Sequence, residues 1–456
     1  MSAPFSFTIS HKLALFLILV ISIIIVIDSN VIKFFTYTYE ELTIVSNLEM
    51  FTGFSVAFSI FAILVLRNIP KRDLKSKYRG GIALDSLHMV VQASQFTVIG
   101  VLIITILQMS FLNIYNSFLI NLIVYISFGS SLLFMILLVL LLAGWFKSSK
   151  NYMIISYAIS FLILSAYLVL SMIYVALQYT YHSDWIEATP IHLALVNFPK
   201  SDLGLSFGLT LDALSLLSFV LLWTATLGLL RQYRNRVGKI RFYIFMSIPL
   251  IYFLFPFETY FGEFFEGFLS VSPIIFSLIY LLVFSATKQV GGVLFSIVFL
   301  TAAAIVNQRN LRNSLIIAAI GIAVLFGSTE IDSLLYAAYP PYGVLTIMLM
   351  PLGSYLLYSG IFESARFLSR DKLLRKEFFQ SAEKQLNFLK TIGVVEMEKE
   401  LEKNLRSILK KSSLQEETVD YGKSDGDVRE LVQEVIHELQ LKKINDKQSD
   451  ESKSMK

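Results

Sequence analysis

Long apolar blocks separated by short polar segments fill the first 366 residues of this 456-residue chain. The blocks are roughly 15 to 28 residues long, and a helix needs about 20 residues to cross the ~30 Å hydrocarbon core of a bilayer. Lipid cannot hydrogen-bond to the backbone, so spanning segments must be helices or closed barrels, and the blocks lack the alternation of barrel strands. The sequence therefore predicts an all-α fold, a polytopic transmembrane helical bundle of 10–11 spans. The candidate spans cover residues 10–27, 48–66, 88–109, 118–146, 151–178, 207–230, 242–257, 269–287, 290–306, 314–328 and 344–366.

Charge divides the chain into two parts. Residues 1–366 carry 20 Lys+Arg and 16 Asp+Glu, whereas the last 90 residues carry 18 of each. A hydrophobic content of 55% is more than one soluble core can bury, so lipid is the expected environment of the first part. We expect a transmembrane domain at 1–366, a cytoplasmic helical tail at 367–443 and a disordered C-terminus at 444–456.

The charged loops predict the orientation. Lys and Arg cluster after the second, fourth and sixth blocks, and the loops between them carry mainly acids, so the positive-inside rule puts the basic loops in the cytoplasm. The first block stops at Asp28, which we interpret as the start of an outer loop. We therefore predict a multi-pass protein of the cell membrane, with its N-terminus and C-terminal tail in the cytoplasm. The basic residues are Arg67, Lys71, Arg72, Lys75, Lys77, Arg79, Lys147, Lys150, Arg231, Arg234, Arg236, Lys239 and Arg241.

The alternation of loop charge fails in the last third. Eleven crossings would place the charged tail outside, against the rule, whereas an odd number of crossings within residues 268–306 restores it. Lys288, Gly291 and Gly292 interrupt an apolar run there, which is typical of a broken or re-entrant helix. Two ordinary helices joined by a tight turn explain the pattern equally well.

The tail has an apolar stripe at helical spacing, from Leu374 to Ile408, and a capping box at Asp427 and Glu430 that predicts a second helix. An apolar stripe on a solvated helix needs a partner. We expect self-association or a protein partner through residues 367–443, with a coiled coil as one arrangement, although Gly393 weakens its middle.

Ionisable side chains within the spans are few, and such residues are functional by default. Asp212, about one turn into the sixth block, is suited to bind a cation or carry a proton if it is buried. At the outer interface it would instead cap or hydrogen-bond its own helix. Asp85 and His88 lie three residues apart, as either a helix-end pair or a proton relay. Lys288 is the remaining embedded candidate.

Two outer loops also carry candidate groups. His182, Asp184, Glu187 and His192 have side chains that can bind zinc, but their spacing matches no established motif, and a solvated loop is the alternative. Glu258, Glu263 and Glu266 stand among aromatic residues, as either an acidic vestibule for cations or an interfacial aromatic belt with solvated carboxylates.

The sequence contains no phosphate loop, dinucleotide fingerprint, nucleophile elbow, HExxH or kinase signature. It also contains no cysteine, which excludes disulfides and thiolate metal sites. We therefore expect no enzyme activity, no cofactor and no nucleic-acid partner. The lipid bilayer is the partner that the composition predicts.

One region resembles a known family. Its motifs are Tyr339-Pro340-Pro341-Tyr342-Gly343, Gly353-Ser354-Tyr355-Leu356, Gly360-Ile361, Ser364-Ala365, Lys372-Leu373 with Arg375, and Glu396-Met397-Glu398-Lys399-Glu400. Residues 240–410 are similar to an uncharacterised family of multi-span membrane proteins of ammonia-oxidising archaea. The resemblance implies a cell-membrane location and the same architecture, and it implies no functional residues.

Two functional hypotheses follow. The amphipathic tail favours a sensory, signalling or scaffolding protein that acts through its cytoplasmic helices. The alternative is a transporter or channel for a small cation or solute, indicated by Asp212, the acidic outer loops and the expected break at Gly291 and Gly292.

Overall fold

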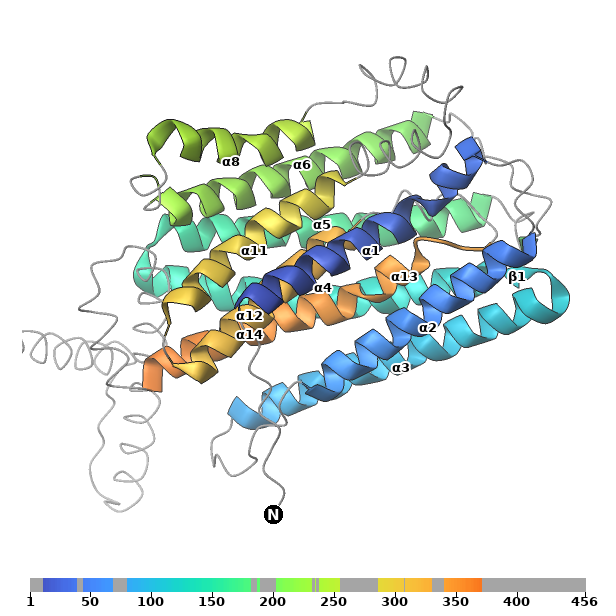
Figure 1. Ribbon diagram of the computed structural model, residues 1–456, viewed down its shortest axis with the longest axis horizontal. Helices are drawn as coiled ribbons and strands as arrows, with labels where there is room; N and C mark the ends of the chain where they lie inside the picture. Colours follow the sequence, from blue (N-terminus) through green and yellow to red (C-terminus); the bar gives the residue numbers. More distant parts are fainter. Residues whose placement is uncertain are drawn as a thin grey trace, which may run out of the picture. The chain divides into compact units, whose positions relative to one another are not determined.

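The computed structural model describes residues 11–38, 44–68, 80–181, 187–188, 202–231, 234, 238–254, 286–306, 308–329 and 340–370 (Figure 1). The elements are α1 (His11–Thr38), α2 (Ile44–Asn68), α3 (Gly80–Leu112), β1 (Tyr115–Asn116), α4 (Ser117–Ser149), α5 (Tyr152–Tyr181), β2 (Glu187–Ala188), α6 (Asp202–Leu230), α8 (Lys239–Leu254), α11 (Thr287–Ile305), α12 (Arg309–Gly327), α13 (Val344–Met348) and α14 (Met350–Arg370). The chain divides into two compact units, and all the described residues up to Ser364 belong to the first.

The described residues confirm the predicted fold class. Nine of their helices, counting α13 and α14 as one span, are long and apolar enough to cross a membrane. α8 corresponds to the expected span at 242–257 but has 16 residues, and the expected span at 269–287 lies almost wholly outside the described residues. β1 and β2 form a two-residue antiparallel ladder that joins the α3–α4 turn to the chain after α5.

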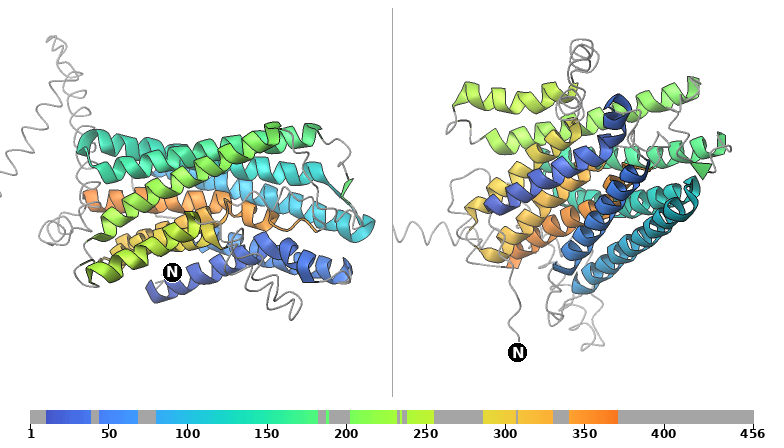
Figure 2. Two further views of the ribbon diagram at one scale, coloured as in Figure 1. Left: turned by 90° about the horizontal axis from the view of Figure 1, so that it is seen from above. Right: turned by 45° about the vertical axis from the view of Figure 1, so that its right-hand side comes forward.

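Consecutive helices from α3 to α6 pack side by side, and α11 packs against α12, α1, α6 and α8. The α13–α14 segment lies in the middle of the bundle, between α4 on one side and α1 and α2 on the other (Figure 2). Every residue from 340 to 357 is buried. In contrast, helices at the periphery expose large apolar side chains such as Phe16, Phe96 and Leu162, as lipid-facing surfaces do.

Basic residues gather at one end of the bundle, which we call the basic end. Successive helices run in opposite directions, so α1, α3, α5, α8 and α12 begin there and α2, α4, α6 and α11 end there, on the left of Figure 1. α11 begins at the opposite end, where Ala286 packs with Val26 of α1. Residues 286–306 therefore make one crossing. Within the first unit, the described lysines and arginines of this end are Lys12, Arg67, Lys147, Lys150, Arg231, Arg234, Lys239, Arg241, Arg309 and Arg312.

The structure has no helix break at Gly291 and Gly292, where the sequence allowed one. α11 continues without interruption from Thr287 to Ile305. The two glycines instead allow close packing: a Cβ on Gly291 would collide with the Phe219 ring of α6, and one on Gly292 would lie 3.0 Å from the Ala323 carbonyl oxygen of α12. Small residues at such crossings let membrane helices approach each other closely.

The α12–α14 crossing is closer still, because backbone touches backbone. A Cβ added at Gly353 would lie 2.8 Å from the Leu325 nitrogen, and one at Gly360 would lie 2.6 Å from the Ala318 nitrogen. Gly321 faces the backbone of α14 in the same way. α14 is therefore held against α12 without intervening side chains.

Candidate ion-binding site

The buried carboxylate of the described residues is Asp28, which the sequence placed in an outer loop. α1 does not stop at this residue but continues to Thr38, and the Asp28 side chain is 1% exposed. The expectation was wrong because an Asp-Ser-Asn sequence looks like a helix end, whereas here Asp28 and Ser29 bond to Thr346 of another helix. α1 packs against α11, α12 and α13.

The partner of Asp28 lies at a break in the last span. α13 has five residues and starts after Gly343, whose φ of 89° lies in the left-handed region that favours glycine. Leu349 separates α13 from α14. Pro351 is consistent with the interruption, because it has no N–H to donate to the Ile347 carbonyl.

One oxygen of the Asp28 carboxylate holds the short helix α13. Oδ2 accepts hydrogen bonds from the Thr346 backbone N–H at 2.9 Å and from the Thr346 hydroxyl at 2.7 Å. The Ser29 hydroxyl donates to Thr346 Oγ1 at 3.4 Å. Thr346 is the third residue of α13, so its N–H has no acceptor within that helix. Asp28 supplies this acceptor from a helix 318 residues away in the sequence.

The other carboxylate oxygen of Asp28, Oδ1, does not bond to α13 in this way. Oδ1 is buried and has no hydrogen-bond partner among the described residues, although the Gly343 backbone lies near enough to interact with the carboxylate. The Tyr342 phenol is also close, and its ring packs edge-on against Phe51 with centroids 5.3 Å apart. A buried charge with one unsatisfied oxygen is costly unless a proton or a cation neutralises it.

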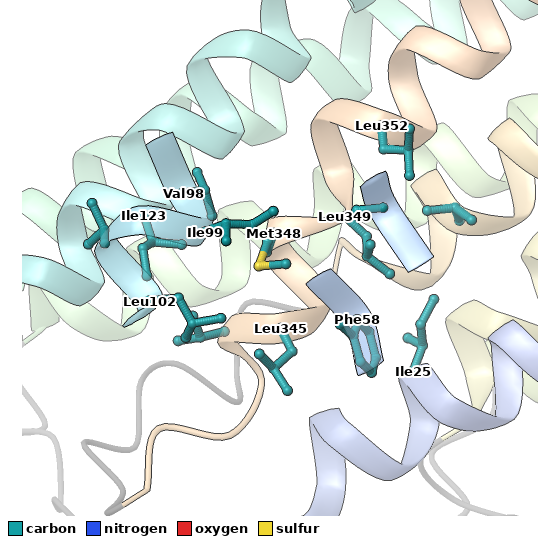
Figure 3. Close-up of a cluster of buried hydrophobic side chains, with 14 of the residues drawn as sticks. Ile25, Phe58, Val98, Ile99, Leu102, Ile123, Leu345, Met348, Leu349 and Leu352 are labelled. Atoms are coloured by element: carbon teal, nitrogen blue, oxygen red, sulfur yellow. The ribbon is translucent and has the colours of Figure 1, made fainter. Parts of the chain in front are cut away.

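Apolar side chains also pack around the α13–α14 break. Figure 3 shows this core, in which α1, α2, α3 and α4 all contribute side chains that face α13 and α14. The labelled residues are Ile25, Phe58, Val98, Ile99, Leu102, Ile123, Leu345, Met348, Leu349 and Leu352.

α3 brings two polar side chains to the same segment. Gln95 Nε2 donates to the Met348 carbonyl at 2.7 Å, which is one of the last carbonyls of α13. Nearer the basic end, His88 Nδ1 is hydrogen-bonded to the Tyr355 hydroxyl at 3.2 Å. The sequence singled out His88 with Asp85 as its partner, and the structure instead brings His88 to Tyr355, while Asp85 is exposed. Neither Gln95 nor Tyr355 could be identified as a partner from spacing, because both contacts join distant helices.

Lys288 contacts the C-terminal end of α12. It lies in the first turn of α11, and its Nζ donates to the Thr329 carbonyl at 3.4 Å, just beyond the C-terminal end of α12. The Tyr167 hydroxyl donates to the same carbonyl at 2.8 Å, and Nζ is 5.8 Å from the centre of the Tyr167 ring. A cation at the C-terminus of a helix is stabilised by the helix dipole and by the aromatic face.

The other predicted site residues are not brought to this place. Asp212 lies within α6 with its side chain exposed, so of the two alternatives that the sequence left open the buried carboxylate is not the one found. Glu187 belongs to β2, whereas the described ranges exclude His182, Asp184, His192, Glu258, Glu263 and Glu266. Among the described residues, no group of three or more His, Asp or Glu could hold a metal ion.

The predicted helical tail falls almost wholly outside the described residues. Residues 371–456, which include nearly all of the predicted helical tail and the 444–456 segment, lie outside the described residues. The sensory, signalling or scaffolding hypothesis and the coiled coil therefore stay predictions.

The fold makes this chain an α-helical membrane protein. Comparisons with known protein families, curated proteins and solved structures find no match. The resemblance to an archaeal family thus stays a prediction, and function has to be argued from the site.

Proposed function

We propose that this protein is an ion-coupled transporter for a small solute, and that Asp28 is the carboxylate that binds the coupling ion. The observation that carries the proposal is the unpartnered, buried Oδ1 atom of Asp28 beside the break between α13 and α14. Intramembrane carboxylates are costly, and they commonly mark ion and proton pathways. Discontinuous helices beside such groups are typical of secondary transporters.

The arrangement also links ion binding to movement. A proton or cation on Oδ1 changes the charge of the group that holds the Thr346 N–H and hydroxyl, and therefore changes the strength of both bonds. In this proposal the short segment α13, between Gly343 and Leu349, moves in response to that change. The charge distribution supports an orientation in the cell membrane with the basic end toward the cytoplasm.

Two variants with the same chemical change test this proposal. The full-length protein, reconstituted in liposomes, is adsorbed to a solid-supported membrane and exposed to rapid jumps of H⁺, Na⁺ or K⁺. Each jump is made alone and with a panel of amines, amino acids and sugars. We expect transient currents that Asp28→Asn abolishes, because asparagine can still accept the Thr346 bonds but cannot change charge. Asp212→Asn removes an exposed carboxylate and should leave the currents unchanged.

Two outcomes contradict the proposal. One is a wild-type protein that gives no current with any ion or solute of the panel. The other is an Asp28→Asn variant whose currents equal those of the wild type.

A further inference from the structure

Three buried polar atoms on α3 and α4 lack, among the described residues, the partners that buried polar groups normally have. Gln95 Oε1, Ser127 Oγ and Ser131 Oγ are buried and have no hydrogen-bond partner within the described part of the chain. Such atoms are satisfied by protein groups or by ordered water in the great majority of cases. Ordered water is one kind of partner that would satisfy these three atoms on the neighbouring helices α3 and α4.

The serines of α4 lie on the side of the helix that packs against α13 and α14. Ser127 is four residues after Ile123 and seven before Phe134, so all three share one face of α4. Ile123 and Phe134 both belong to the core around Leu345 and Met348. Ser131 lies one turn beyond Ser127, toward Phe134.

The three helices are also in register. His88 of α3 and Phe134 of α4 both contact Tyr355 of α14, with ring centroids 5.7 and 5.4 Å from that of Tyr355. α4 runs antiparallel to α3. Moving away from the basic end, the residue numbers rise along α3 and fall along α4 and α14.

Seven residues from this level, in the direction of Asp28, lie Gln95 on α3, Ser127 on α4 and Met348 at the end of α13. The Gln95–Met348 hydrogen bond confirms that two of them meet. Seven helical residues span about 10.5 Å. A water file with oxygen atoms about 2.8 Å apart would need about three molecules to bridge this gap.

The second level leads on to the carboxylate. Thr346 is two residues before Met348 and bonds to Asp28 directly. Polar groups thus occur at three successive levels: the His88–Tyr355 pair, the Gln95 and Ser127 level, and Asp28.

We propose that these atoms line a file of water molecules that carries protons between His88 and Asp28, so that the coupling ion is the proton. This inference rests on the proposed function. Each water accepts a proton from one neighbour and gives one to the next, and Asp28 takes the last proton on Oδ1 to become a neutral acid. Histidine suits the entrance because its imidazole gains and loses a proton near neutral pH.

The other ionisable groups nearby do not replace these two. Two ionisable residues lie beside His88. Asp85 of the same helix is exposed, and Tyr355 of α14 is hydrogen-bonded to His88. Beside Asp28, Tyr342 is the neighbouring phenol, and Lys288 of the adjoining α11 donates to the Thr329 carbonyl. Neither α12 nor α13 has an acidic or basic residue beside Asp28: α13 contains none, and Arg309 and Arg312 of α12 lie at the basic end.

Infrared spectroscopy tests the file without a known solute. In full-length protein in liposomes, the C=O band of a protonated carboxyl that disappears in Asp28→Asn is assigned to Asp28, and its shift after transfer to D₂O gives a rate of exchange. We expect the double variant Ser127→Ala/Ser131→Ala to slow this exchange. The matched control is Ser165→Ala, a buried serine whose hydroxyl bonds to the Phe161 carbonyl of its own helix, and it should exchange at the wild-type rate.

Proton uptake into the same liposomes, driven by a potassium diffusion potential and followed with an enclosed pH dye, gives the second measurement. We expect His88→Phe to slow uptake by about a hundredfold or more, the low end of what a positioned proton-transfer group contributes. Wild-type rates of exchange and uptake in these variants would overturn the inference. Currents that need Na⁺ and no protons, and that Asp28→Asn abolishes, would also overturn it while the proposed transport function stands. Currents unaffected by Asp28→Asn would overturn both.

Discussion

Replacing Gly321 by alanine should separate α12 from α14 and destabilise the bundle. The added Cβ would lie 2.8 Å from the Leu356 carbonyl carbon and 2.9 Å from the Gly353 oxygen, and it would collide with the Leu357 nitrogen. These are backbone atoms, so no side chain can rotate to make room. Overpacking costs about 1–3 kcal/mol, and a backbone collision belongs at the upper end of that range. Alanine gains about 1 kcal/mol over glycine in a helix, which leaves a net loss of about 1–2 kcal/mol.

Gly53 and Gly129 provide matched controls, because a Cβ at either position meets nothing within 4 Å. Their alanine variants should keep the helix-propensity gain and unfold at the same or a higher denaturant level than the wild type. The assay is equilibrium unfolding of the purified protein in mixed micelles with a rising fraction of dodecyl sulfate, followed by tryptophan fluorescence. If Gly321→Ala is as stable as Gly129→Ala, the two helices do not pack backbone to backbone.

Two further stability predictions concern α13, and the same unfolding assay checks both. A double-mutant cycle of Thr346→Val with Asp28→Ala, which removes the accepting carboxylate, should give a coupling energy of about 1.5–3 kcal/mol, the range for hydrogen bonds to charged groups, and additive effects would contradict the 2.7 Å bond. Gly343→Ala should cost about 1–2 kcal/mol, because φ of 89° is unfavourable for an L-residue. Gly100→Ala, which meets no neighbour, should not be destabilised, so equal behaviour of these two variants would refute the strained conformation at Gly343.

The spans were predictable because their signal is local. An apolar run of the right length needs no information from the rest of the chain, and so the described helices fall where hydropathy placed them. The length of an apolar run predicts a span with lipid-facing residues, and the charge of the loops predicts the basic end.

The site was not predictable, because its bonds join distant residues. Nothing near Asp28 in the sequence shows that Thr346 will supply two donors, so the residue was interpreted as the end of a span. For Asp212 the sequence left burial and an interface position open, and α6 presents the side chain on an exposed face. Hydropathy identifies a span but not the side that faces the bundle.

The break in the last span lies next to a proline, Pro351, whereas the sequence indicated a break at two glycines. Gly291 and Gly292 suggested an interruption, but a glycine keeps its N–H and is compatible with helix, and at this crossing it makes room for a neighbour. Pro351 cannot donate, and the structure is interrupted beside it. Loss of a backbone donor fits this one break but does not by itself predict one, because Pro249 lies inside the continuous helix α8.

The bond between α1 and α13 has a consequence for synthesis and insertion. Asp28 precedes Thr346 by 318 residues. At about 5–20 residues per second, roughly 16 to 64 s pass between the synthesis of the two partners. During this time α1 must carry a carboxylate whose acceptance into the bilayer costs about 2.5–3.5 kcal/mol, against a gain of about 0.3–0.6 kcal/mol for each Leu, Ile, Val or Phe. The many apolar residues of α1 can meet that cost alone, but the helix acquires its permanent hydrogen bonds when the last span arrives.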